Sequence, residues 1–161
     1  MPHIENSTQV IDACRKLADG ARLLGVPVFV TEQYPKGLGA TVEPLRGHAA
    51  NRQEKLRFGA FESLGWGESS PDDSRHRIMV AGVEAHVCVQ QTVLELIAYG
   101  YRVYVAADAV GSRHAVDREW ALQRMLASGA IVTTSESLLF EWCETAEAPE
   151  FKALSRLVTG R

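Results

Sequence analysis

The sequence is poor in several features that define whole classes of protein. Its 161 residues carry 17 Lys and Arg against 20 Asp and Glu, a net charge of −3. Domains that bind nucleic acid or anionic membranes usually carry an excess of positive charge, so neither partner is expected. The apolar runs have the length of strands and fall short of the roughly 20 residues that cross a bilayer.

Cysteine is also scarce, and the three residues Cys14, Cys88 and Cys143 are far apart. An odd, widely spaced set argues against a disulfide framework and favours a reducing compartment, so a cytoplasmic location is expected. The five histidines fall into no metal-ligand spacing. No G-x-G-x-x-G motif follows an apolar strand, which argues against a dinucleotide site. The sequence thus predicts no metal and no cofactor.

What the sequence does contain is an alternation of apolar strands with amphipathic helices. The expected strands are residues 26–31, 78–81, 103–107 and 130–133, and the expected helices are residues 7–24, 87–99, 116–128, 135–144 and 149–158. Strands that are apolar throughout belong to parallel sheets covered on both faces. We therefore predict one three-layer α/β/α, Rossmann-like domain over residues 1–161, with loops and short helices between residues 32 and 75.

The segment around Cys88 is the strongest candidate for chemistry. An apolar strand leads into Gly82, a short turn follows, and Cys88 stands where the next helix begins. Free backbone N–H groups and the helix dipole favour a thiolate there, and the same N–H groups can stabilise an oxyanion. Most lone cysteines are inert core residues, so this position alone leaves both interpretations open. In parallel sheets the site lies beyond the carboxyl ends of the strands, where the loops after Thr31, Gly82 and Asp108 are expected to meet.

Several stretches together carry a family resemblance over nearly the whole chain. They are Thr31-Glu-Gln-Tyr-Pro-Lys-Gly-Leu-Gly39, Lys55 before Phe58 and Phe61, Gly82-Val-Glu-Ala-His-Val-Cys88, Asp108-Ala-Val-Gly-Ser-Arg113, and residues 129–136. These stretches resemble the isochorismatase-like cysteine hydrolases, which include nicotinamidases and carbamoyl-group hydrolases. The first stretch is most similar to the isochorismatase domain-containing proteins.

The resemblance implies a hydrolase chemistry of a definite kind. It places the nucleophile on Cys88 and a steadying ammonium on Lys55, and it implies a covalent thioester-type intermediate with a small amide, imide or ester. It also implies a cis peptide between Val83 and Glu84, which turns the Glu84 N–H towards the Cys88 N–H as an oxyanion hole. Relatives are commonly dimers or larger, so a homo-oligomer is expected.

The expected substrate pocket is lined by Gln33, Tyr34, Phe58 and His86. Aromatic residues in this part of the sequence fit an apolar pocket wall and fit a packed core equally well; they are Tyr34, Phe58, Phe61 and Trp66. Relatives that hold zinc do so through an Asp-x-His pair, and the matching stretch here reads Thr31-Glu-Gln-Tyr34. The resemblance therefore also predicts no catalytic metal.

One part of the family pattern is missing. Relatives carry an aspartate, which accepts the thiol proton, at the end of a first strand that lies centrally in their sheet. This sequence starts with residues that follow the aspartate in relatives. Three hypotheses follow: further residues precede Met1, a rearranged segment fills the gap, or the chain is a degenerate, oligomeric binding or scaffold protein on the same fold. Glu84 and His86 are candidates for a substitute base.

Overall fold

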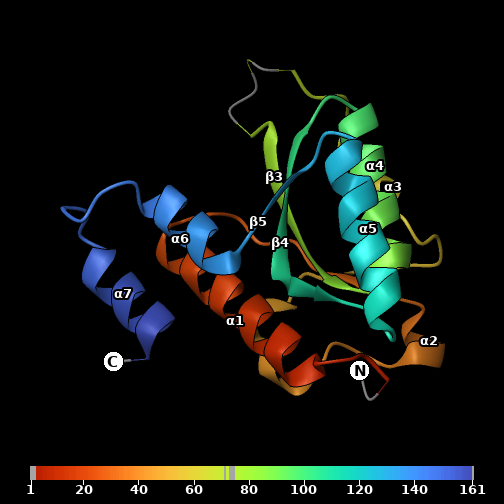
Figure 1. Ribbon diagram of the computed structural model, residues 1–161, viewed down its shortest axis with the longest axis horizontal. Helices are drawn as coiled ribbons and strands as arrows, with labels where there is room; N and C mark the ends of the chain where they lie inside the picture. Colours follow the sequence, from red (N-terminus) through yellow and green to blue (C-terminus); the bar gives the residue numbers. More distant parts are fainter. Residues whose placement is uncertain (1–2, 71, 73–74, 161) are drawn as a thin grey trace.

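Two parallel sheets lie at the centre of the molecule. The computed structural model describes residues 3–70, 72 and 75–160 (Figure 1). Its described strands are β1 (Thr31–Gln33), β2 (Gln53–Lys55), β3 (Arg77–Val83), β4 (Arg102–Gly111) and β5 (Ile131–Thr133). One sheet pairs β1 with β2, and the other has the order β3-β4-β5, with every pair parallel. The predicted parallel α/β class is confirmed.

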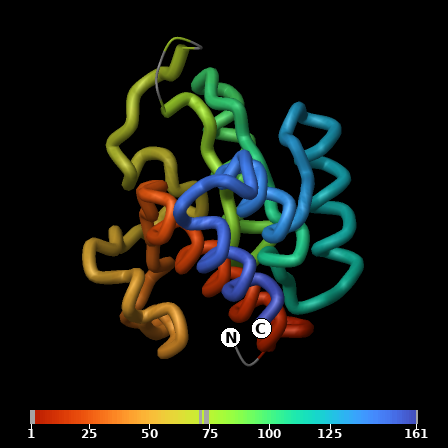
Figure 2. Tube along the Cα trace, turned by 90° about the vertical axis from the view of Figure 1, so that its left-hand side faces the viewer, coloured from red at the N-terminus to blue at the C-terminus, as the bar shows by residue number. Residues whose placement is uncertain are grey.

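Helices cover both faces of the three-stranded sheet, which gives the predicted three layers (Figure 1). On one face lie α1 (Ser7–Leu23), α6 (Ser135–Cys143) and α7 (Phe151–Thr159), and on the other lie α3 (Phe61–Leu64), α4 (Gln90–Ala98) and α5 (Ala115–Ala127). The short helices α2 (Pro35–Leu38) and η1 (Glu43–His48) lie between β1 and β2, and Figure 2 shows this segment on the side of the molecule away from α5. None of the helices described here is long and apolar enough to cross a membrane.

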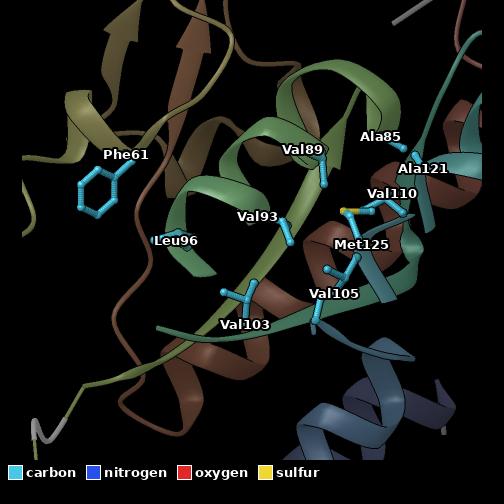
Figure 3. Close-up of a cluster of buried hydrophobic side chains, with 11 residues drawn as sticks. Phe61, Ala85, Val89, Val93, Leu96, Val103, Val105, Val110, Ala121 and Met125 are labelled. Carbon is cyan, nitrogen blue, oxygen red and sulfur yellow. The ribbon is translucent and has the colours of Figure 1, made fainter. Parts of the chain in front are cut away.

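Strand β4 separates two hydrophobic cores. Val103 and Val105 point to the core beneath α4 and α5, where Figure 3 shows them packed with Val93 and Met125. Ala106 belongs to the opposite core, beneath α1, α6 and α7. Successive side chains of a strand point to opposite faces, so a strand buried on both faces is apolar throughout, as the sequence pattern indicates.

The prediction was wrong in the region before β2. Residues 26–30 were expected as a strand, but the strand is Thr31–Gln33, and Val28 and Phe29 are exposed. Residues 53–55 were expected in a loop and form β2 instead. The Gln-Glu-Lys sequence of β2 has no apolar pattern, and pairing with β1 rather than local preference makes it a strand.

Two element boundaries near the candidate nucleophile also differ from expectation. The predicted helix 87–99 starts with a π-helical turn, η2 (Ala85–Val89), and only then continues as α4. Cys88 therefore lies in the turn before α4 and not in the first turn of that helix. Strand β4 also runs on to Gly111, through residues that were expected in a loop.

The described strands form two separate sheets. Among the described residues, β1 pairs only with β2, and β3 pairs only with β4 and not with β1. Most of β3 is half-buried, whereas β4 is largely buried. As an edge strand among the described residues, β3 keeps backbone groups unpaired on one side.

Candidate active site

The carboxyl ends of β1, β2 and β3 bring the predicted catalytic residues together. Gln33 ends β1, Lys55 ends β2, and Cys88 follows β3 in the turn η2. The side chains of all three residues meet, because the Gln33 Oε1 atom is a common acceptor for the other two. This arrangement crosses the division between the two sheets.

Lys55 is buried and fully hydrogen-bonded. Its side chain donates from Nζ to Gln33 Oε1 at 2.6 Å, to the Phe58 carbonyl at 2.6 Å and to the Arg57 carbonyl at 3.0 Å. These three acceptors match the three protons of an ammonium group. Burial lowers the pKa of Lys55 below its ordinary value, while Cys88 and Glu95 oppose that shift. The result is a cation held at a fixed point beside the thiol.

Cys88 is half-buried near the end of the turn η2. Its Sγ atom donates to Gln33 Oε1 at 3.9 Å. The turn is closed by the N–H groups of Val87 and Val89, which both donate to the Glu84 carbonyl. A cis peptide joins Val83 to Glu84, at the position that the resemblance implies.

Gln33 has a fixed orientation that the sequence does not reveal. Its Nε2 atom donates to the Leu56 carbonyl at 2.7 Å, which leaves Oε1 to face Lys55 and Cys88. The amide oxygen therefore lies between the thiol and the ammonium. An amide cannot act as a base near neutral pH, so Gln33 orients these groups and does not take the proton.

One face of α4 contacts both Cys88 and the loop of residues 56–60 between β2 and α3, called here the Lys55 loop. The Thr92 hydroxyl donates to the Cys88 carbonyl at 2.7 Å and accepts the Ala60 N–H at 3.0 Å. Glu95 accepts the Phe61 N–H at 3.3 Å. Sequence reasoning missed Thr92 and Glu95, although positions four and seven residues after Cys88 share its helical face.

Gly59 lets the Lys55 loop approach α4 closely. A Cβ atom at this position would lie 2.2 Å from both Glu95 carboxylate oxygens. Any side chain at Gly59 would therefore displace Glu95 and break its hydrogen bond with Phe61.

The other side of the turn is occupied by a polar cluster. Arg113 donates from its backbone N–H and from Nε to Glu84 Oε2, at 3.1 and 3.0 Å. His86 contacts the Ser112 Oγ atom through Nδ1 at 3.0 Å, and its Nε2 atom lies 3.9 Å from Asp117 Oδ2. Within the described part of the chain, neither Glu84 nor His86 forms a hydrogen bond with Cys88. The hypothesis that one of them is a substitute base gains no contact to support it.

The aromatic residues divide between surface and core. Tyr34, which precedes α2, and Phe58, in the Lys55 loop, are both exposed. Phe61 is buried and stacks on Tyr99 with ring centroids 3.9 Å apart, and Trp66 packs against Phe29 with centroids 5.1 Å apart. The core interpretation holds for Phe61 and Trp66, and the pocket wall stays a prediction for Tyr34 and Phe58.

Glu32 lies in the stretch where zinc-binding relatives carry an Asp-x-His pair, and its carboxylate is hydrogen-bonded within the protein. Its oxygens accept from Thr41 N–H at 2.8 Å, from Thr41 Oγ1 at 2.6 Å and from Arg52 Nε at 2.9 Å. These contacts, led by the Thr41 hydroxyl, hold the pKa of Glu32 below its ordinary value. In the described residues no three His, Cys, Asp or Glu side chains gather as a metal site would require. Glu32 thus fixes the segment that carries α2 and η1.

Comparisons with known proteins match the chain to one family. The family model of the isochorismatase domain matches residues 1–137. The chain is 39% identical over 158 residues to isochorismatase domain-containing protein 1 of Salmo salar, covering 98% of this chain and 56% of that protein. The chain thus spans about half the length of this relative.

Solved structures show the same fold. A Caenorhabditis elegans structure described as MAR1 ribonuclease is 36% identical, with a TM-score of 0.86, over 98% of this chain and 82% of that one. The YcaC product of Escherichia coli, described as an octameric hydrolase of unknown specificity, is 21% identical, with a TM-score of 0.80, over 93% of this chain and 75% of that one. The second likeness concerns the fold alone.

Proposed function

Because the chain belongs to the isochorismatase family, we propose that it hydrolyses a small amide, imide or ester with Cys88 as the nucleophile. The fold is that of the family's hydrolases, and the cysteine mechanism is the proposal. The observation that carries it is the shared contact of the Cys88 thiol and the Lys55 ammonium with Gln33 Oε1. A fixed cation beside a thiol favours the thiolate, which is the reactive form.

The proposed reaction proceeds in two halves. The Cys88 thiol loses its proton to solvent, and the thiolate attacks the carbonyl carbon to form a C–S bond. The carbonyl electrons move to oxygen, where the N–H groups of Glu84 and Cys88 are the proposed oxyanion donors. Collapse expels an amine or alkoxide, which takes a proton, and leaves a thioester. Water then attacks the thioester, releasing the acid and restoring the thiol.

The alternative is a degenerate family member that acts as an oligomeric binding or scaffold protein. One observation favours it: the Cys88 thiol donates its hydrogen bond to the amide oxygen of Gln33, and an amide is not a base. The two functions differ in the reactivity that they require of Cys88, because a scaffold needs no activated thiol.

Alkylation with iodoacetamide separates the two functions. Mass spectrometry of peptides from the intact protein gives the labelling rate of each cysteine near neutral pH. The hydrolase proposal requires Cys88 to react faster than Cys14, Cys143 and a free thiol such as N-acetylcysteine. A Cys88 rate equal to that of the free thiol would contradict the hydrolase and favour the scaffold.

Assembly and location are further proposals. We infer a homo-oligomer, in line with the octamer named for the Escherichia coli neighbour, and light scattering on the purified chain measures it directly. The three cysteines are free, which supports the proposal of a reducing compartment such as the cytoplasm.

A further inference from the structure

We propose that the substrate is an uncharged molecule whose apolar group lies on a rim beside Cys88. This apolar rim consists of four exposed side chains: Tyr34, Leu38, Leu56 and Phe58. The inference rests on the proposed function and adds a substrate class to it. Three independent features of the rim support it: its exposure, its attachment to the site, and the charge balance around it.

The rim exposes more apolar surface than a solvated loop requires. The exposed fractions are 49% for Tyr34, 72% for Leu38, 76% for Leu56 and 51% for Phe58. Single exposed apolar residues are common, but a group of large ones in adjacent segments marks a binding surface. The Leu38 N–H donates to the Tyr34 carbonyl, so the first two residues share one helical turn.

Each segment of the rim is bonded to a residue of the site. The Tyr34 N–H donates to the Lys55 carbonyl at 2.9 Å. The Leu56 carbonyl accepts from Gln33 Nε2, and the Phe58 carbonyl accepts from Lys55 Nζ. These backbone groups are used internally, so the rim offers a ligand its apolar side chains rather than hydrogen bonds. A group attached to a carbonyl at Cys88 would therefore meet apolar surface.

Three of the cations near the site are already compensated. Lys55 is enclosed by three oxygen acceptors. Arg57 pairs with Glu62 at 3.2 Å, and Arg113 pairs with Glu84 at 3.0 Å. A substrate carboxylate would have to displace one of these partners, because binding an anion here requires a charge-assisted hydrogen bond. The arrangement favours a neutral substrate.

Covalent probes of matched reactivity test this inference on the intact chain. The probes are 2-chloroacetamide, 2-chloro-N-phenylacetamide and chloroacetate, and each rate at Cys88 is divided by the rate of the same probe with N-acetylcysteine. We expect the phenyl probe to be favoured about tenfold over 2-chloroacetamide, because its ring is partly removed from water on the rim. Chloroacetate should be the slowest of the three.

Two matched variants locate the preference. Leu56→Ser removes rim surface and should bring the phenyl preference close to one. Leu126→Ser removes an equally large side chain, 58% exposed on α5, and should leave the preference unchanged. A preference that survives Leu56→Ser together with Leu38→Ser would overturn the rim as the binding surface. A faster reaction with chloroacetate than with 2-chloroacetamide would overturn the neutral substrate class.

The same data distinguish the failure of the inference from that of the proposed function. If Cys88 reacts with every probe at the free-thiol rate, the nucleophile is not activated and the proposed function fails. If Cys88 is activated but shows no phenyl preference, only the apolar rim fails. Light scattering then shows whether a second copy of the chain covers the rim instead.

Discussion

Cys88 and Cys14 make an instructive pair, because both lie beside the parallel sheet and only one has a cation next to it. Cys14, on α1, donates from Sγ to the Ala109 carbonyl at 3.2 Å. Burial, reinforced by the Asp108 carboxylate, raises the pKa of Cys14 to about 12. Cys88 instead faces the Lys55 ammonium across Gln33. Deeper burial and an acidic neighbour, rather than distance from the sheet, separate the inert Cys14 thiol from the candidate nucleophile.

Cavity volume alone would favour the Cys14 side of the molecule over Cys88. A cavity of about 1070 Å³ is lined by residues of α1, α6 and the start of α5, on the side of Cys14. Neither Cys88 nor Lys55 lines it. Two of its charged groups bind within the protein, since Asp108 accepts the Ser135 N–H and Arg118 donates to the Val110 carbonyl. The candidate active site is therefore defined by the contacts of Cys88 and not by the volume of this cavity.

Removing each thiol in turn is the most severe test of the comparison. We expect Cys88→Ser to reduce hydrolysis of a neutral phenyl ester by at least about a thousandfold, because the proposed reaction has no other nucleophile. Cys14→Ser should retain the activity within about threefold, since its thiol is hydrogen-bonded away from the site. Initial rates on the purified variants measure both. Equal losses in the two variants would remove the distinction.

Removing the cation should bring Cys88 closer to Cys14. We expect Lys55→Met to slow alkylation of Cys88 near pH 7 by about tenfold, because the thiolate loses its positive neighbour. The rate at Cys14 should not change, and it should keep rising with pH towards its pKa of about 12. Site-resolved alkylation from pH 6 to pH 11 measures both profiles. An unchanged Cys88 profile would show that Lys55 does not activate the thiol.

The Glu32 carboxylate, one residue before Gln33 on β1, should contribute to the stability of the fold. Glu32→Gln should lower the free energy of unfolding by about 1–3 kcal/mol at pH 7, because it weakens buried, charge-assisted hydrogen bonds with Thr41 and Arg52. The lowered pKa of Glu32 means that its contribution is complete above the ordinary glutamate value and is lost as the pH falls through the native value. The difference between the variant and the natural chain should therefore shrink in acid.

Denaturant unfolding at pH 7 and at pH 3 gives this difference. Glu62→Gln, at an exposed ion pair with Arg57, is the control and should change stability by less than about 0.5 kcal/mol. A Glu32→Gln effect that grows in acid would contradict the assigned direction.

The smallest effect is expected at Glu95. Its carboxylate raises the pKa of Lys55 against the effect of burial. Glu95→Gln should therefore let Lys55 lose its proton at a lower pH, and the alkaline part of the Cys88 alkylation profile should change by about two- to threefold. Gln91→Glu, an exposed change on the same helix, is the control. A profile identical to that of the natural chain would show that Glu95 has only a structural role.

How much of this could be predicted depends on the kind of signal. Apolar periodicity correctly gave α1, α5 and the order of strands and helices, because those elements bury one face or both. The resemblance placed Cys88 and Lys55, which periodicity alone would have left as a core thiol and a surface cation. Strand β2 was missed because three polar residues carry no pattern and depend on a partner 22 residues away.

The finer parts of the site depend on side-chain directions. Gln33 presents its oxygen to Lys55 because its Nε2 atom is bonded to the Leu56 carbonyl. This contact joins the ends of two strands. Thr92 and Glu95 occupy the helical face of Cys88, and this spacing was readable in the sequence. Their partners, the backbone amides of Ala60 and Phe61, were not, because no pattern specifies how that loop meets α4.

Helix α4 also connects the two parts of the site, which are the turn that carries Cys88 and the Lys55 loop. The amide hydrogens of Ala60 and Phe61, in the loop after Lys55, are covered by Thr92 and Glu95 of the helix that follows Cys88. Exchange of these two hydrogens with solvent deuterium requires the loop to leave α4. Their protection thus reports, on the timescale of local opening, the fraction of molecules in which this loop has left α4.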